Sequence, residues 1–162
     1  MTPEEKRKKY LENVYRYLGI RNRSEKEIRD YLVKKKAEPE IVEHIIELLQ
    51  KQKFLNDEEF ARGWVRQRAQ FRPKGKSALK FELIQKGISA DIIEKVLAEE
   101  QEDIPDQLTQ AQRLIGKRIE KLKGAPRQEI YNKVGAFLAR RGFDWDTIKK
   151  AIDDSLLHKD KE

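Results

Sequence analysis

The sequence predicts an all-α protein built from three tandem three-helix repeats that stack into an elongated, curved array. Apolar residues recur at helical spacing along nearly all of its 162 residues, and no segment alternates apolar and polar residues as a strand would. The pattern around Tyr10 returns at Phe60 and again at Gln110. A period of about 50 residues is typical of stacked units that are each too small to bury a core alone. The expected ranges are 1–54, 55–103 and 104–157 for the repeats and 158–162 for a disordered tail.

The first repeat has clear helix-start signals. Thr2 and Pro3 suit the N-cap and first position of a helix that Gly19 should end. Ser24 and Glu27 have the spacing of a capping box for the second helix. The third helix should begin at Glu38-Pro39 and bury an apolar face made of Ile41, Val42, Ile45, Ile46, Leu48 and Leu49.

The first helix of the middle repeat should begin after Asn56, a favourable N-cap residue. Phe60, Ala61, Trp64 and Val65 then form one apolar stripe. We expect Trp64 to be buried in the core between repeats. The alternative, that Trp64 stacks on nucleic-acid bases, is the weaker interpretation because apolar stripes usually pack inside.

The second helices end at equivalent positions in the three repeats. Lys36, Gly87 and Gly142 each lie four residues after a leucine of the second helix. Glycine just past a helix suits a backbone with positive φ. Pro73 and Gly75 separate the first two helices of the middle repeat.

Charge follows the same repeat. The chain has 36 Lys and Arg against 29 Asp and Glu, a net charge of +7, and its third helices are acidic while the second helices are basic. Between Arg62 and Lys86 there are eight basic residues and a single acid, Glu82. A basic stripe in register with the repeats indicates nucleic-acid binding. The alternative is that these are ordinary solvated faces that balance one another.

Aromatic residues near this basic segment could stack on bases. Phe71 lies at the basic helix end and is the better contact candidate. Phe81 and Trp145 are further possibilities, whereas Phe143 falls on an apolar stripe and should be a core residue.

The sequence contains no pattern typical of a catalytic site or a metal site. The chain has no cysteine and only two histidines, which lack ligand spacing. The string from Arg72 to Ser77 contains Gly-Lys-Ser but lacks the upstream glycine of a phosphate-binding loop. We therefore expect no catalytic residue, metal or cofactor. There is also no leader-like apolar region and no long apolar run, so we expect a cytoplasmic protein.

Three spaced segments of the chain form a recognisable motif: Arg21 to Ile28, Leu55 to Ala61, and Glu82 to Ile88 with Gly75 ahead of it. Together they resemble the RecX family, bacterial regulators of the RecA recombinase. The family-motif residues that should serve the structure are Ser24, Glu27, Asp57, Phe60, Ala61, Trp64, Gly75, Leu83, Gly87 and Ile88. The chain departs from the family pattern at Lys35-Lys36-Ala37, and its third repeat lacks the Asp-Phe-Ala-like element.

The resemblance implies a non-enzymatic, monomeric protein that binds the RecA filament on single- or double-stranded DNA. It implies inhibition of ATP hydrolysis and strand exchange, and so a role in recombination, DNA repair and the SOS response. No membrane or small-molecule substrate is implied. A general basic nucleic-acid-binding protein is the alternative. The candidate contact residues are Arg21, Arg23, Arg62, Arg66, Arg68, Arg72, Lys74, Lys76, Lys80 and Lys86.

Overall fold

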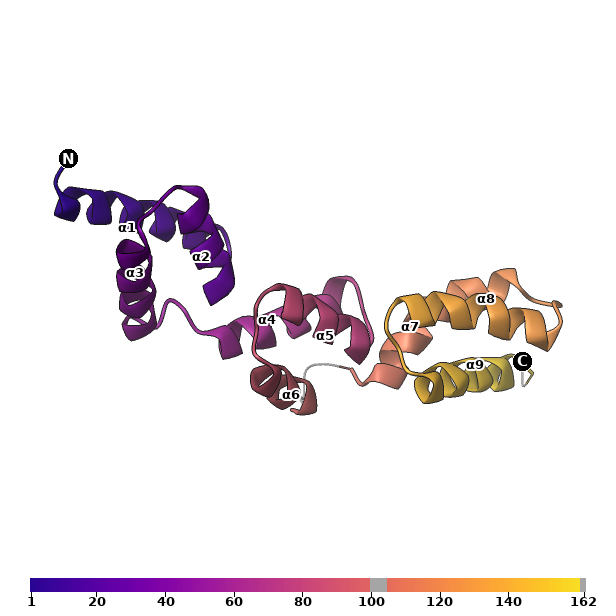
Figure 1. Ribbon diagram of the computed structural model, residues 1–162. Helices are drawn as coiled ribbons and strands as arrows, with labels where there is room; N and C mark the ends of the chain where they lie inside the picture. Colours follow the sequence, from indigo (N-terminus) through magenta and orange to yellow (C-terminus); the bar gives the residue numbers. More distant parts are fainter. Residues whose placement is uncertain (100–104, 161–162) are drawn as a thin grey trace. The chain divides into compact units, whose positions relative to one another are not determined.

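The computed structural model describes residues 1–99 and 105–160, and every regular element in these ranges is a helix (Figure 1). The all-α prediction is confirmed. The helices are α1 (Pro3–Ile20), α2 (Glu25–Lys34), α3 (Pro39–Lys51), α4 (Asp57–Phe71), α5 (Lys76–Gln85), α6 (Ala90–Ala98), α7 (Gln107–Lys121), α8 (Arg127–Arg140) and α9 (Trp145–Asp160).

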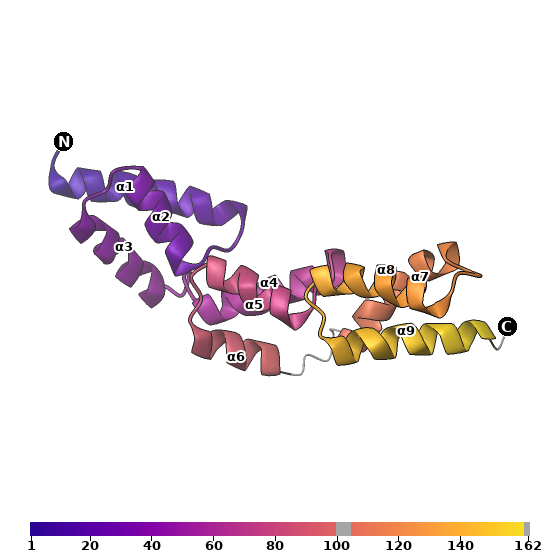
Figure 2. The ribbon, with the colours of Figure 1, turned by 45° about the vertical axis from the view of Figure 1, so that its right-hand side comes forward.

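These helices belong to two compact units. The first comprises Met1–Gly63 and Leu83–Val96, and the second comprises Trp64–Glu82 and the described residues from Leu97 on. Figure 2 shows α1, α2 and α3 packed together in the first unit and α7, α8 and α9 packed together in the second. The division falls within α4 and α5, so both units contain part of the middle repeat.

In the first unit, the helix starts predicted at Thr2 and Ser24 are confirmed, and both are capping boxes. The Thr2 and Ser24 side chains accept hydrogen bonds from the backbone N–H groups of Glu5 and Glu27. In return, the Glu5 and Glu27 carboxylates accept from the backbone N–H groups of Thr2 and Ser24. The prediction that Gly19 ends the helix is wrong by one residue. α1 runs to Ile20 because the backbone at Gly19 is not left-handed. The unit's main apolar cluster is Val14, Ile28, Leu32, Ile41, Val42, Ile45, Ile46, Leu49 and Leu55.

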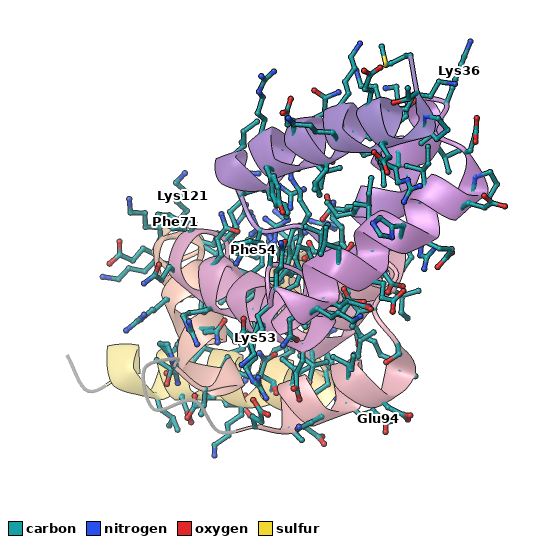
Figure 3. All side chains as sticks on the ribbon, turned by 90° about the vertical axis from the view of Figure 1, so that its left-hand side faces the viewer. Lys36, Lys53, Phe54, Phe71, Glu94 and Lys121 are labelled. Carbon is teal, nitrogen blue, oxygen red and sulfur yellow. The ribbon has the colours of Figure 1, made fainter. Side chains whose placement is uncertain are left out.

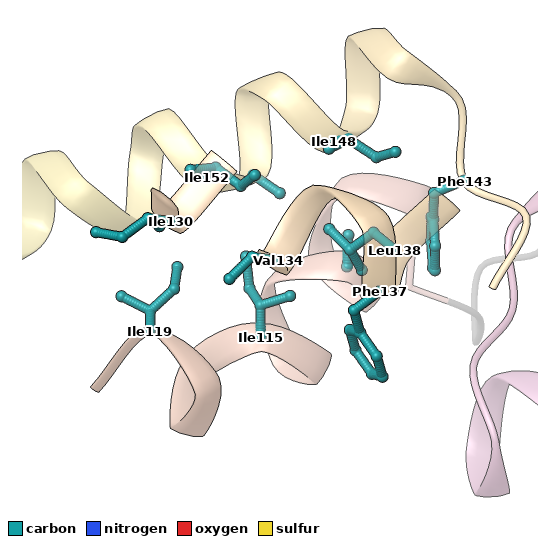
Figure 4. Packing of buried hydrophobic residues seen from close by; sticks show 11 residues of the cluster. Ile115, Ile119, Ile130, Val134, Phe137, Leu138, Phe143, Ile148 and Ile152 are labelled. Atoms are coloured by element: carbon teal, nitrogen blue, oxygen red, sulfur yellow. The ribbon is translucent and has the colours of Figure 1, made fainter. Parts of the chain in front are cut away.

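The core of α7, α8 and α9 is a second apolar cluster (Figure 4). Phe143 lies in it with 5% of its surface exposed, as predicted. The predicted tail at 158–162 needs correction, because α9 continues through Asp160. No glycine or proline follows Leu157 to end the helix. Residues 161–162 lie outside the described residues.

The ends of the second helices share one backbone conformation. Gly87 and Gly142 have φ of +80° and +87°, and Lys36 has φ of +65°. The predicted equivalence of these positions is confirmed. Lys36 therefore adopts a left-handed conformation that is unfavourable for a residue with a Cβ atom.

Two of these helix ends, those of α5 and α8, each contact the start of the second helix of the preceding repeat, and we call these contacts joints. Within the first unit, the Ser24 hydroxyl donates to the Lys86 carbonyl oxygen at 2.7 Å. Within the second unit, the Gly75 N–H donates to the Arg141 carbonyl oxygen at 2.7 Å. In each joint, the start of the second helix of one repeat packs against the end of the second helix of the following repeat.

Close backbone packing explains the glycines at these joints. A Cβ atom on Gly87 would lie 2.5 Å from Cβ of Lys26, and one on Gly142 would lie 2.4 Å from the Ala78 nitrogen. The glycines thus provide both positive φ and room for a neighbouring chain segment. Lys36, at the equivalent position of the first repeat, is exposed.

Candidate nucleic-acid and partner interface

Glu82, the single acid of the basic segment, lies at the centre of a cluster in the second unit. Its carboxylate accepts the indole N–H of Trp64 at 2.7 Å, the Arg68 Nε at 3.1 Å and the Lys74 Nζ at 2.6 Å. The Arg68 guanidinium also lies over the Trp64 ring, 4.9 Å from its centroid. Arg68 and Lys74, both predicted to contact nucleic acid, are therefore neutralised within the protein.

The charges around Glu82 stabilise its ionised form. Burial alone would raise the pKa of Glu82, but the hydrogen bonds from Lys74 and Trp64 and the charges of Arg68 and Lys74 hold the pKa below its ordinary value. The expectation that Trp64 is a buried core residue is wrong. Trp64 is half-buried, because its indole N–H reaches this carboxylate instead of an apolar interior.

Glu27 occupies a similar position in the first unit. Its carboxylate pairs with Arg21, lies 3.8 Å from Arg23 and 3.5 Å from the Lys86 ammonium. Burial would raise the pKa of Glu27, but bonds from Arg21 and the Ser24 N–H, together with nearby positive charge, lower it. These three predicted contact residues thus take part in an internal ion-pair network.

Arg62 is also paired. Its guanidinium lies 3.1 Å from Glu58 on the preceding turn of α4. Glu58 also pairs with Lys95 of α6. Six of the ten predicted contact residues are therefore bound to acids within the described chain.

The other four predicted cations are Arg66, Arg72, Lys76 and Lys80, and we call them, with Phe71, the basic joint. All four are exposed and form no ion pair among the described residues. Lys76 lies near Asp144. Hydrogen bonds from the backbone and side chain of Thr147 are the main cause of the lowered pKa of Asp144, and the positive charge of Lys76 lowers this pKa further.

Aromatic side chains accompany the basic joint. Phe71 is 75% exposed at the end of α4, and Phe81 on α5 is 63% exposed. Figure 3 labels Phe71 among the charged side chains that cover the surface. Trp145 is also exposed, at the start of α9. The prediction that Phe71 is available for contact is consistent with this exposure.

The family-motif residues lie in caps, cores and joints. Phe60, Ala61, Leu83 and Ile88 are buried. Asp57 accepts the Glu25 N–H at 2.8 Å, and burial is the main cause of its raised pKa. The family-motif residues therefore hold the helices in place and do not form one chemical site.

The described residues show few features of other sites. No group of three or more His, Cys, Asp or Glu side chains gathers there as metal ligands would. No helix among the same residues has the length and apolar character needed to cross a membrane. The sequence did not predict two features: the central role of Glu82, and a cleft in the first unit lined by Lys6, Lys9, Lys35 and Lys36. For Glu82, the available signal was its position as a single acid in a basic segment.

Comparisons with known proteins give one consistent result. Models of the first, second and third three-helix domains of RecX match residues 11–49, 56–97 and 105–152. The regulatory protein RecX of Prosthecochloris aestuarii is 35% identical over 151 residues, which cover 93% of this chain and 96% of that protein. The crystal structure of RecX from Lactobacillus salivarius matches with a TM-score of 0.85 at 25% identity, covering 95% of this chain and 99% of that one.

Other relatives are longer. The regulatory protein RecX of Bacillus pumilus is 36% identical over 155 residues, covering 96% of this chain but 58% of that protein. The chain therefore spans little more than half the length of this relative.

Proposed function

This chain belongs to the RecX family of regulatory proteins, and on that basis we propose that it binds the RecA recombinase and its filament on DNA. In this proposal it inhibits RecA-dependent ATP hydrolysis and strand exchange, and so regulates recombination, DNA repair and the SOS response. It acts without enzymatic chemistry of its own, as a monomer in the bacterial cytoplasm.

The basic joint carries this proposal. Its four cations form no close ion pair among the described residues, in contrast to the six that Glu27, Glu58 and Glu82 neutralise. Unpaired like charges repel one another, so a negatively charged partner would stabilise their arrangement. Nucleic-acid phosphates or an acidic recombinase surface would supply that charge.

The test uses the double variant Lys76→Gln/Lys80→Gln. Both lysines are exposed and form no close ion pair among the described residues, whereas Lys74 is bound to Glu82 and would confound the result. We expect weaker inhibition of RecA ATP hydrolysis on single-stranded DNA. We also expect the slope of log affinity against log salt to fall by roughly 1.4, at about 0.7 per phosphate contact. The matched control is Lys117→Gln/Lys149→Gln, which removes the same charge from exposed lysines of α7 and α9.

The two readouts separate the possible partners. Loss of DNA binding with full inhibition of RecA would mean that the basic joint serves DNA and that another surface meets RecA. If the control pair lowers both readouts as much as the test pair, the basic joint is an ordinary solvated surface and the proposal fails.

A general nucleic-acid-binding function is the second candidate, and the exposed Phe71 beside the cations favours it. Titration of the protein against RecA filaments distinguishes the two functions. A RecA regulator inhibits at or below stoichiometry with RecA, whereas a general binder inhibits only when it coats the DNA.

A further inference from the structure

The first unit contains a cleft that the proposed function does not use. Its volume is about 440 Å³, within the usual range of small-ligand sites. Lys6 and Lys9 line it from α1, and Lys35 and Lys36 line it from the turn between α2 and α3. The Tyr10 hydroxyl donates to the Lys35 carbonyl oxygen at 3.3 Å and so holds this turn against α1.

The cleft is strongly positive. Its lining contains four lysines and one acid, Glu38. None of these four lysines forms an ion pair in the part of the chain that the structure describes, although the Lys35 ammonium lies 5.7 Å from the centre of the Tyr31 ring. Cations grouped in a concave surface concentrate positive potential and attract anions.

The backbone at Lys36 is left-handed where α2 ends. Lys36 has φ of +65°, a conformation that the equivalent Gly87 and Gly142 adopt without a Cβ penalty. At those glycines the close packing of a neighbouring helix start excludes a side chain, whereas Lys36 is exposed and lines the cleft. In Figure 3 Lys36 lies at the periphery, among other long side chains. Lys53, which follows α3 and does not line the cleft, has a similar φ of +62°, so this backbone conformation is how both helices end, and at Lys36 it places the lysine in the cleft lining.

We propose that this cleft binds phosphate groups, either of a nucleic-acid backbone or of a free polyphosphate. Lysine ammonium groups bind phosphate as mobile point charges, and four of them can neutralise more than one phosphate. The lining offers no exposed aromatic platform, since Tyr10 is half-buried. Recognition would therefore be independent of base sequence.

Adjacent lysines on α1 provide a matched pair of variants. Lys8 and Lys9 are both exposed, and each has Glu5 and Glu12 three or four residues away. Only Lys9 lines the cleft. Lys9→Gln and Lys8→Gln thus remove the same charge from equivalent helical surroundings, and circular dichroism checks that both variants keep the helical fold.

The first arm of the experiment is calorimetric titration with pyrophosphate at low salt, without RecA. We expect the unaltered protein to bind, Lys8→Gln to bind equally well, and Lys9→Gln to bind about tenfold more weakly, as for the loss of one charge-assisted hydrogen bond. The second arm measures the salt dependence of binding to a single-stranded oligonucleotide. A slope reduced by about 0.7 in Lys9→Gln alone identifies a backbone phosphate as the ligand.

The two arms distinguish the sources of phosphate. Weaker pyrophosphate binding with an unchanged oligonucleotide slope identifies a free polyphosphate. If the unaltered protein binds neither ligand, or if Lys8→Gln and Lys9→Gln weaken binding equally, the proposal is overturned. Because RecA is absent, this result is independent of the proposed regulation of RecA.

Discussion

Replacing Gly75 by alanine should test the joint of the second unit directly. The new Cβ would lie 2.1 Å from the Gly142 carbonyl carbon and 2.2 Å from the Phe143 nitrogen, whereas ordinary contacts begin at 3.4 Å. The two segments must therefore separate by about 1.3 Å. This separation breaks the 2.7 Å bond from the Gly75 N–H to Arg141 and the 3.3 Å bond from the Ser77 N–H to Gly142.

The expected cost combines three contributions. Overpacking costs about 2 kcal/mol, and the lost hydrogen bonds cost about 1 kcal/mol. The lower entropy of the unfolded alanine chain offsets about 1 kcal/mol. We therefore expect Gly75→Ala to lower the free energy of unfolding by about 2 kcal/mol, which corresponds to a fall in melting temperature of roughly 4–8 °C.

Gly116→Ala is the matched control. Gly116 is exposed on α7, and an added Cβ meets no atom within 4 Å. The same chemical change there should raise stability by up to about 1 kcal/mol. Thermal melts of both variants by circular dichroism should therefore shift in opposite directions. Equal shifts would refute the inference that close backbone contact requires glycine at position 75.

Three further predictions concern strain and the Glu82 cluster. Lys36→Gly should raise the free energy of unfolding by about 1 kcal/mol because it relieves a left-handed φ, and unchanged urea unfolding would argue against strain there. Trp64→Phe keeps an aromatic side chain but replaces the indole by a smaller phenyl ring and removes the N–H donor to Glu82, so it should cost about 1.5 kcal/mol; full stability in urea would mean that this bond contributes little. Folding lowers the pKa of Glu82 from its ordinary value of 4.5. The ionised Glu82 carboxylate therefore contributes its full stabilisation above pH 4.5, and this stabilisation is lost as the pH falls through the lower pKa of the folded state. Glu82→Gln should therefore be less stable than the unaltered protein at pH 7, with a smaller difference near pH 3; an equal difference at both pH values would contradict the assignment.

The sequence by itself determined the helical class, the repeat and many helix ends of this protein. These features follow from interactions between residues close in the chain. The Ser24 side chain accepts a bond from the N–H three residues ahead, and Gly87 adopts its positive φ two residues past the end of α5. The Arg62–Glu58 pair, at helical spacing, belongs to the same local class.

Only the tertiary structure decided which cations remain available to a partner. Lys86 approaches Glu27 across 59 positions of sequence, and Arg68 meets Glu82 from a different helix. Ion pairing depends on distance in space, so a count of basic residues cannot separate Lys74, bound to Glu82, from the exposed Lys76 two positions later. The lysine cleft has the same origin, since Lys9 and Lys36 line one hollow only because α1 packs beside the turn that follows α2.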